Sequence, residues 1–509
     1  MELALLSRIA HAQEQMVRDL RDFVRIPSVS KDRDQVKAAL AFYLDRARQM
    51  GLKARSVLSD RVGVVEWGAG EETVGVLVHA DVVGPGERSE WPCDPFEGMI
   101  AEDRVFGRGT VDDKGPAISV LYALDAIRAV CPDPRKRVQI IIGTQEETEW
   151  SDIAAYAAAY KLPDYGFTPD GEFPIANREK GYVDIEVSFP SAERGGIEEY
   201  RLLELSGGHG ANSIPDRARA TVRGPGQALS RLKKRCEAIS FMESEALVDG
   251  LRLTAKGRSA HSSLPHAGVN AIERLCEVLA TEPFAPSALA EAVRFLDAHR
   301  EDPYGRRWGL YRLEDLVEGQ YFDHTTIVPT RIETKEGGVA ITYNLRTVPP
   351  VDRRQIEAAF RERLLGFYGV TRILDYKDPL MVNPRYPFLE VMARAYEEVS
   401  GLPNSYRLAY GTSYAKAMDR FVSWGPLFPG DEDTAHQAGE SLSITSWMNA
   451  CLLYTSDAAD DLPCVDLGGR RVSTKHTYQY IADYVIFNRT NRSHARPVCK
   501  QYTLPLPPS

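Results

Sequence analysis

Histidine and carboxylate side chains recur in this sequence where short apolar segments end. His79 and Asp81 follow VGVLV, Glu146 and Glu147 follow VQIIIGTQ, and Asp170 ends the run YGFTPD. Imidazole nitrogens and carboxylate oxygens are common ligands of divalent cations, and zinc in particular is bound by both. The pattern therefore predicts a metal-dependent site to which several loops contribute ligands.

Two further segments extend the candidate set. Asp112 and Asp113 lie in GRGTVDDKG, just before a predicted helix, and His436 lies in FPGDEDTAHQAGE. Two histidines and three carboxylates suit a pair of divalent cations about 3.5–4 Å apart, provided that one carboxylate bridges them. Zinc is the expected metal, and cobalt or manganese are the expected substitutes.

The adjacent glutamates can divide two tasks between them. Side chains of consecutive residues diverge, so that one of Glu146 and Glu147 can bind metal while the other takes a proton from a metal-held water. Asp81 is placed to bond the far ring nitrogen of His79 and to fix its tautomer. Each of these motifs alone is weak evidence for a metal site, since histidines and paired glutamates most often lie in solvated loops. Five such motifs at successive strand ends are much harder to explain as coincidence.

The elements that would position these residues alternate between strand and helix. Residues 74–78 and 138–143 are apolar runs typical of strands buried on both faces, while residues 36–50, 116–130 and 151–160 have helical spacing. This alternation predicts an α/β domain with a mainly parallel sheet. Binding sites in such sheets form beyond the carboxyl ends of the strands, so the candidate ligands can converge on one crevice.

From about residue 185 the pattern changes to alternating, half-exposed strands. These strands and the helices between them predict an α+β domain on an antiparallel sheet, inserted into the first domain. The helical pattern resumes near residue 385. We therefore expect a catalytic domain over residues 1–186 and 384–450 and an inserted lid over residues 187–383.

Bulk properties exclude several classes of protein. The chain of 509 residues is too long for one hydrophobic core. Its net charge of −10 gives no indication of nucleic acid or an anionic membrane as a partner. The sequence lacks a run of about eighteen apolar residues, and its start indicates an amphipathic helix and not a signal peptide. Seven scattered cysteines without a CxxC pair argue against a disulfide framework and fit a cytoplasmic protein.

Six motifs together resemble the twentieth family of metallopeptidases over roughly residues 10–450. They are HADVVGPG, GRGTVDDKGP, TQEETEW, TPDGEFP, GRSAHSS and PGDEDTAHQ. That family includes carnosinase-like dipeptidases, glutamate carboxypeptidases and succinyl-diaminopimelate desuccinylases. Within it, TPDGEFPIANREKGY and FPGDEDTAHQ are most similar to bacterial Xaa-His dipeptidases with an enlarged lid.

The resemblance implies a role for each candidate residue of the first domain. One zinc ion would be bound by His79 and Asp170, the other by Glu147 and His436, and Asp112 would bridge the two. Glu146 would be the general base, with Asp81 supporting His79.

The resemblance also implies roles for three lid residues. His261 in GRSAHSS would stabilise the oxyanion, Asn212 would hold the substrate, and Arg346 would bind its terminal carboxylate. The segment LAYGTSYAKAMD departs from the glycine-richer stretch of these dipeptidases. Tyr410 and Ser413 there leave the shape of the pocket open.

The implied activity is hydrolysis of the peptide bond of small unblocked dipeptides by attack of a metal-bound water. Two alternatives stay open: an N-acyl-amino-acid deacylase or carboxypeptidase of the same family, and a metal-free binding protein of the same fold. The binding protein is disfavoured because every ligand and the base are present. The long lid indicates that one chain completes its own site, so we expect a monomer.

The end of the sequence differs in character. CLLYTSDAADD and CVDLGGRR, within residues 451–471, are similar to translated sequencing-library adapters in their expected order. We therefore expect residues 451–509 to be a non-native tail and the terminal helix, which begins near Ser443, to contain foreign residues.

Overall fold

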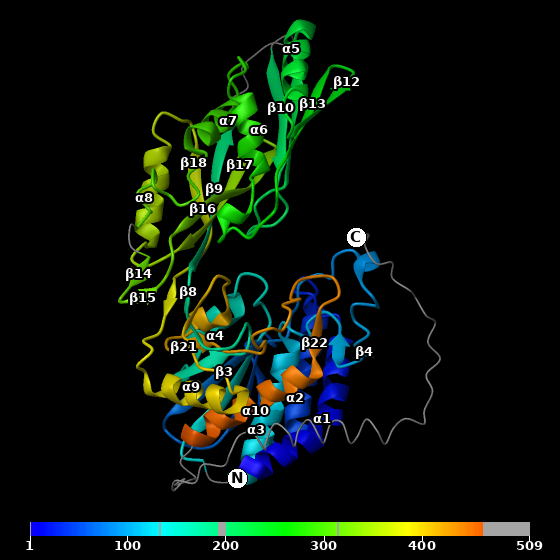
Figure 1. Cartoon of the computed structure of the whole chain (residues 1–509), viewed down its shortest axis with the longest axis vertical. Coiled ribbons are helices and arrows are strands. Elements are labelled where there is room, and N and C mark those ends of the chain that lie inside the picture. Colours follow the sequence, from blue (N-terminus) through cyan, green and yellow to red (C-terminus); the bar gives the residue numbers. More distant parts are fainter. Residues whose placement is uncertain (1, 132–133, 192–199, 313–314, 462–509) are drawn as a thin grey trace.

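The chain folds into two domains, each built around its own sheet (Figure 1). The computed structural model describes residues 2–131, 134–191, 200–312 and 315–461. The main domain comprises the described residues up to 180 and from 378 onward. The lid domain comprises residues 181–377 and lies above the main domain in Figure 1.

The main-domain sheet has nine strands in the order β1-β2-β6-β3-β7-β21-β8-β19, and β20 also pairs with β8. Its centre, from β6 through β3 and β7 to β21, is parallel, and antiparallel pairs extend it toward both edges. The α/β class is confirmed. The strands are β1 Lys53–Val57, β2 Val62–Trp67, β3 Thr73–His79, β6 Arg137–Gly143, β7 Tyr165–Thr168, β8 Ala176–Glu179, β19 Leu380–Met381, β20 Arg407–Ala409 and β21 Phe421–Ser423.

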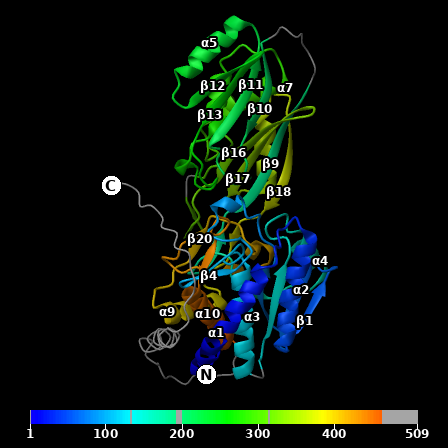
Figure 2. The same cartoon turned by 90° about the vertical axis from the view of Figure 1, so that its right-hand side faces the viewer.

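Helices flank this sheet. In Figure 2, α2 and α4 lie on the side of β1, and α9 and α10 lie on the opposite side. Helix α3 packs against α1 and α10. A small sheet, β22-β5-β4, lies beside them. The elements are α1 Glu2–Val24, α2 Arg33–Gln49, α3 Lys114–Val130, α4 Ser151–Ala159, α9 Pro387–Ser400, α10 Ile444–Asp461, β4 Met99–Ala101, β5 Arg104–Phe106 and β22 Ser441–Ser443, with short 3-10 helices at Arg88–Glu90 and Tyr414–Ala417.

The lid domain is an eight-stranded antiparallel sheet in the order β12-β13-β11-β10-β16-β17-β9-β18. The inserted domain is therefore of the expected kind. Its strands are β9 Gly181–Pro190, β10 Arg201–Gly207, β11 Arg217–Arg223, β12 Met242–Leu247, β13 Gly250–Lys256, β16 Thr326–Lys335, β17 Gly338–Thr347 and β18 Val370–Lys377, with the hairpin β14 Leu316–Val317 and β15 Gln320–Tyr321. Its helices are α5 Gly226–Glu237, α6 Ala271–Leu279, α7 Ala288–His299 and α8 Arg353–Arg363, with a 3-10 turn at Pro265–Ala267.

The chain changes sheets a few residues before each expected boundary. It passes from β8 to β9 at Lys180 and returns between β18 and β19, whereas the sequence placed these points at residues 186 and 383. Segment 181–186 alternates apolar and polar residues, a pattern that fits either sheet. Hydropathy alone therefore does not mark the crossing.

Helix α10 continues beyond the expected end of the native chain at residue 450. Cys451, Leu452, Leu453 and Tyr454 are buried, and the Tyr454 ring stacks on Phe167 with their centroids 5.4 Å apart. The structure thus packs the first adapter-like residues into the core of the main domain. Residues 455–461 of the expected tail continue α10, and residues 462–509 lie outside the described residues.

Among the described residues, no helix is long and apolar enough to cross a membrane. Cys93, Cys236, Cys276 and Cys451 have free thiols, but Cys131 is disulfide-bonded, which the scattered spacing did not indicate. The cytoplasmic location stays a prediction.

Candidate metal centre

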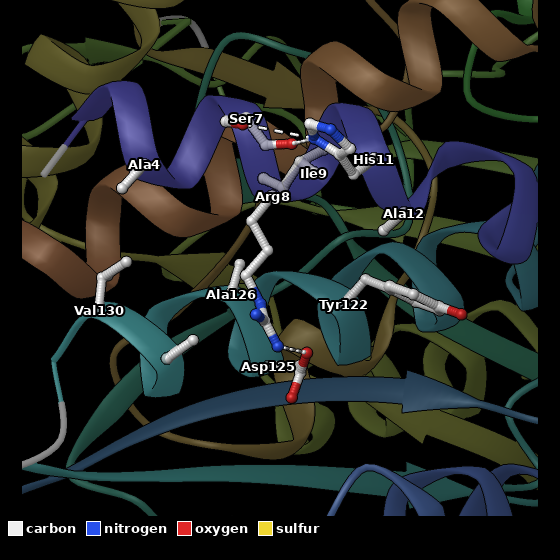
Figure 3. A pocket seen from close by; sticks show the side chains of 11 residues that line it. Ala4, Ser7, Arg8, Ile9, His11, Ala12, Tyr122, Asp125, Ala126 and Val130 are labelled. Atoms are coloured by element: carbon white, nitrogen blue, oxygen red, sulfur yellow. Dashed lines mark hydrogen bonds and ion pairs between the residues drawn. The ribbon is translucent and has the colours of Figure 1, made fainter.

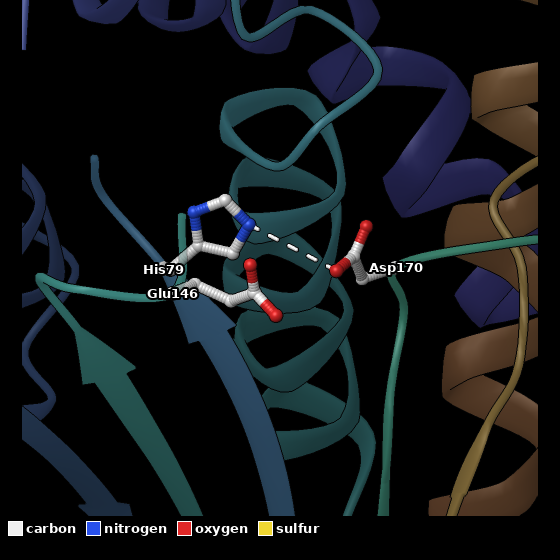
Figure 4. A group of neighbouring side chains, drawn as sticks. All are labelled: His79, Glu146 and Asp170. Carbon is white, nitrogen blue, oxygen red and sulfur yellow. Dashed lines mark ion pairs between the residues drawn. The ribbon is translucent and has the colours of Figure 1, made fainter. Parts of the chain in front are cut away.

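Strand register brings three of the predicted residues together. In the parallel pairing of β3 with β6, His79 lies beside Gly143, shortly before Glu146. In the pairing of β3 with β7, Val76 lies beside Phe167, so that continuing the register brings His79 level with Asp170. Figure 4 shows the side chains of His79, Glu146 and Asp170 pointing toward one another. One potential ligand atom from each lies within 4.8 Å of the other two.

A second group forms beside the first. Potential ligand atoms of Asp112, Glu147 and His436 also lie within 4.8 Å of one another. Asp112 connects the two groups, because its Oδ1 is 2.8 Å from His79 Nε2 and its Oδ2 is 2.9 Å from His436 Nε2. His436 Nε2 is also 3.2 Å from Glu147 Oε1. The five predicted ligands therefore converge, with Asp112 between the two histidines.

The donor atoms of this cluster fit divalent cations. His79 Nε2, Asp112 Oδ1 and Glu146 Oε1 are buried and make no hydrogen bond of acceptable geometry, although the first two atoms are 2.8 Å apart. Buried polar atoms are normally satisfied, so several orphaned atoms that face one another need an explanation. The hydrogen bond at the other nitrogen of the His79 ring explains why Nε2 can act as a metal ligand. Its Nδ1 is 2.9 Å from the Asp81 carbonyl oxygen, which can only accept, and this leaves a free lone pair on Nε2.

The pKa shifts of the carboxyl groups in this cluster also favour bound cations. Burial, together with the negative charge of neighbouring carboxylates, raises the pKa values of Glu146 and Asp170 well above those of ordinary carboxyl groups, although His79 opposes the shift. Burial and the charge of Asp112 likewise raise the pKa of Glu147. Cations between the carboxylates would relieve both the repulsion and the cost of burial.

Asp81 supports the site differently from the prediction. The backbone carbonyl of Asp81, and not its carboxylate, holds the His79 ring; the carboxylate Oδ1 lies 3.6 Å from Nδ1. The carboxylate instead accepts hydrogen bonds from the backbone N–H groups of Glu146 at 3.2 Å and Glu147 at 3.4 Å. Asp81 thus positions the two-glutamate loop as well as the histidine.

Glu440 is a buried positioning residue that the sequence analysis missed. Its carboxylate pairs with Arg108 at 2.6 Å and accepts hydrogen bonds from the N–H groups of Gly109, Val111 and Asp112. The antiparallel pairing of β5 with β22 brings these segments together. The loop that carries Asp112 is therefore fixed by a residue four positions after His436.

The lid closes one side of the site. A cleft of ≈ 440 Å³ lies between the domains. Its lining includes Asp112, Glu146, Glu147, Asp170 and His436 from the main domain and Asn212, His261 and Arg346 from the lid domain. The structure therefore brings the predicted lid residues to the predicted metal centre within one chain.

His261 is held as a neutral hydrogen-bond donor. Burial, and then the positive charges of Arg346 and Lys180, lower the pKa of His261 to about 4. The backbone N–H of Ser263 donates to its Nδ1 at 3.3 Å. Nδ1 is therefore the acceptor of the ring, so the proton is on Nε2 and is available to a substrate oxygen.

Arg346 is buried in the lining of the cleft, at 2% exposure. Its Nη1 donates to Thr412 Oγ1 at 3.2 Å and to the Tyr410 carbonyl at 3.4 Å, both neutral acceptors. Among the described residues, no carboxylate lies within ion-pair distance of its guanidinium. A buried guanidinium without an anion is suited to bind a carboxylate.

The segment around Tyr410, which differs from the glycine-richer stretch of similar dipeptidases, lies beside Arg346. Ser413 is buried and donates from Oγ to Glu179 at 2.6 Å, while Gly411 and Thr412 line the cleft. The side chain of Ser413 thus anchors the loop, and Thr412 provides the contact to Arg346. Thr412 was not predictable from its sequence surroundings, because the side chain of a loop threonine is usually solvated.

A second cavity, of ≈ 620 Å³, lies between α1 and the C-terminal half of α3 (Figure 3). Arg8 and Asp125 form an ion pair there at 2.8 Å. Asp112 and Asp113, by contrast, precede the N-terminus of α3. The cavity therefore forms no part of the candidate centre.

The two groups of histidine and carboxylate side chains form a candidate site for divalent cations at the edge of an α/β sheet. The sequence profile described as Peptidase family M20/M25/M40 matches residues 75–458. The chain belongs to this family and is a hydrolase that acts on peptide bonds, which confirms the resemblance found in its motifs.

Individual relatives agree with this assignment. The chain is 30% identical over 465 residues to "Putative dipeptidase YtjP" of Bacillus subtilis (strain 168), an alignment that covers 88% of this chain and 97% of the relative. Its fold is similar to that of human carnosine dipeptidase 1, with a TM-score of 0.57, 17% identity and coverage of 91% of this chain and 98% of the other. It is also similar to that of the di-peptidase Dug1p from Saccharomyces cerevisiae, with a TM-score of 0.53, 17% identity and coverage of 90% and 99%.

Proposed function

We propose that the protein is a dinuclear zinc dipeptidase that hydrolyses small unblocked dipeptides. The observation that carries the proposal is the position of Asp112, whose two oxygens face His79 and His436 at 2.8 and 2.9 Å. His79 and Asp170 would hold one ion and Glu147 and His436 the other. Zinc suits this set of nitrogen and oxygen ligands.

When bound, the two ions would lower the pKa of a water molecule and polarise the scissile carbonyl group. Glu146 is the proposed general base, because its Oε1 faces the ligand cluster without a hydrogen-bond partner. It takes the proton from the attacking water and delivers it to the leaving nitrogen. His261 donates from Nε2 to the oxyanion that develops on the carbonyl.

Arg346 is proposed to bind the terminal carboxylate of the substrate. Its buried guanidinium and the ligand cluster line the same cleft, which would place the carboxylate and the scissile bond of one small substrate together. Relatives that are named putative dipeptidases, such as the one from Bacillus subtilis, support this choice over a deacylase. Because one chain lines the whole cleft, we also propose that the enzyme acts as a monomer.

The test compares substrates that differ at one end. Zinc-loaded protein is assayed with an unblocked dipeptide, its N-acetyl derivative, its C-terminal amide and an N-acyl amino acid. The proposal predicts preference for the unblocked dipeptide and loss of hydrolysis after chelation. Preference for the N-acyl amino acid would instead establish a deacylase, and activity unaffected by chelation would contradict the metal centre.

A further inference from the structure

One wall of the cleft is a stack of alternating aromatic and cationic side chains that spans both domains. Lys377 Nζ lies 4.5 Å from the ring centroid of Trp150 and 5.3 Å from that of Tyr182. Arg346 Cζ lies 4.7 Å from the Tyr182 centroid. Trp150 belongs to the main domain and the other three residues belong to the lid domain. The stack therefore connects the surroundings of Glu146 with those of Arg346.

Trp150 holds the backbone of the proposed base. Its Nε1–H donates to the Glu146 carbonyl oxygen at 2.7 Å, and Asp81 accepts from the Glu146 N–H at 3.2 Å. The carboxylate of Glu146 has no such anchor at Oε1. Trp150 also has φ 57°, a left-handed conformation that is costly for a bulky residue. The direction of the Glu146 side chain thus depends on backbone contacts that include the indole.

Lys377 is fixed where it meets the indole. Its ammonium pairs with Asp375 at 2.5 Å, and its side chain is only 10% exposed. Tyr182, on its other side, donates from its hydroxyl to Asp184 at 2.6 Å. A cation over an aromatic face is attracted more strongly when it is shielded from water. The main-domain indole and the lid-domain ammonium are therefore a defined contact and not a chance approach.

We propose that Lys377 and Trp150 are positioning residues that couple the placement of the lid domain to the orientation of Glu146. When the lid domain is docked, the ammonium of Lys377 holds the indole, and the indole holds the Glu146 carbonyl. The same stack ends at Arg346, so a substrate carboxylate bound there stabilises the arrangement that orients the base. This inference rests on the proposed function, since it takes Glu146 as the base.

The kinetic test uses substitutions that separate charge from shape. Lys377→Met keeps the length of the side chain and should lower kcat about tenfold, equivalent to ~1.4 kcal/mol, with KM and bound metal little changed. Lys377→Arg should recover most of the rate. Trp150→Phe keeps an aromatic face but removes the N–H donor, so adding Lys377→Met to it should cost less than the product of the single effects. Independent, multiplicative effects, or a change in KM alone, would overturn the coupling.

A matched control and a second readout distinguish this inference from the proposed function. Arg353→Met removes a cation 5.8 Å from the ring of Tyr376, outside the cleft, and should leave kcat unchanged. The fluorescence difference between wild type and Trp150→Phe isolates Trp150, and Lys377→Met should increase its quenching by acrylamide. Absence of hydrolysis in the wild type would contradict the proposed function. Unchanged quenching would overturn the contact whether or not the protein hydrolyses dipeptides.

Discussion

Two of the residues that face the ligand cluster are held in place by a contact outside the cluster. The Asp81 carbonyl orients the ring of His79, and Glu440 accepts from the backbone N–H of Asp112. Such outer contacts set the tautomer and the direction of a ligand. At the scale of single residues, the chemistry thus depends on neighbours that touch no substrate.

Glu146 and Glu147 differ in their proposed tasks, and substitution separates them. Glu146→Gln should leave bound zinc nearly unchanged and lower kcat about 10²- to 10⁴-fold, because a general base is lost. Metal analysis and steady-state kinetics measure the two effects. Glu149→Gln, at an exposed position in the same loop, is the matched control. Loss of metal from Glu146→Gln would show that this residue is a ligand, as its position beside His79 and Asp170 also allows.

Arg346 should discriminate between substrates by their C-terminal group. Arg346→Ala should lower kcat/KM for an unblocked dipeptide about 10- to 100-fold, because a charge-assisted hydrogen bond is removed. The C-terminal amide of the same dipeptide should be affected much less. Arg331→Ala, at an exposed lid position, should change neither substrate. Equal losses on the acid and the amide would show that Arg346 does not bind the carboxylate.

Among the elements, the loop between β5 and α3 is held by Glu440. This residue lies 332 positions after its ion-pair partner Arg108 in the sequence. Glu440→Ala would leave Arg108 buried without its counter-charge and several N–H groups without an acceptor. We expect a loss of about 3–5 kcal/mol in the free energy of unfolding. Denaturant titration measures it, with Glu432→Ala, at an exposed position, as the control. A free energy of unfolding equal to that of the control would show that Glu440 does not stabilise this loop.

Elements with strong local patterns were predictable from the sequence. The apolar run before His79 forms a strand buried at every position, and the predicted strand 138–143 lies within β6, Arg137–Gly143. The convergence of the candidate residues was also predictable, because the carboxyl ends of parallel strands lie at one edge of the sheet. The remainder depends on contacts between distant segments. Glu440, Thr412 and Lys377 have ordinary local surroundings in the sequence, and only the folded chain shows what they touch.

For the whole molecule, truncation within α10 shows which C-terminal residues the fold requires. Cys451, Leu452, Leu453 and Tyr454 are buried, so a chain that ends at Ala450 should have a markedly lower Tm than one that ends at Asp461. Removing a large buried side chain costs about 2–5 kcal/mol. The zinc affinity of the folded fraction should be equal in both, because every proposed ligand precedes residue 450. Equal Tm values would show that residues 451–461 contribute nothing to stability.

The two domains share one cleft, and we propose that this cleft holds two metal ions per chain. Equilibrium dialysis of metal-free protein against zinc, followed by elemental analysis and a dipeptide assay of the same samples, measures both the number of bound ions and the activity they support. We predict two bound ions per chain at full activity, and loss of both sites in Asp112→Ala, since Asp112 faces both histidines. Saturation at one ion with full activity, or two ions still bound in Asp112→Ala, would contradict the bridged centre.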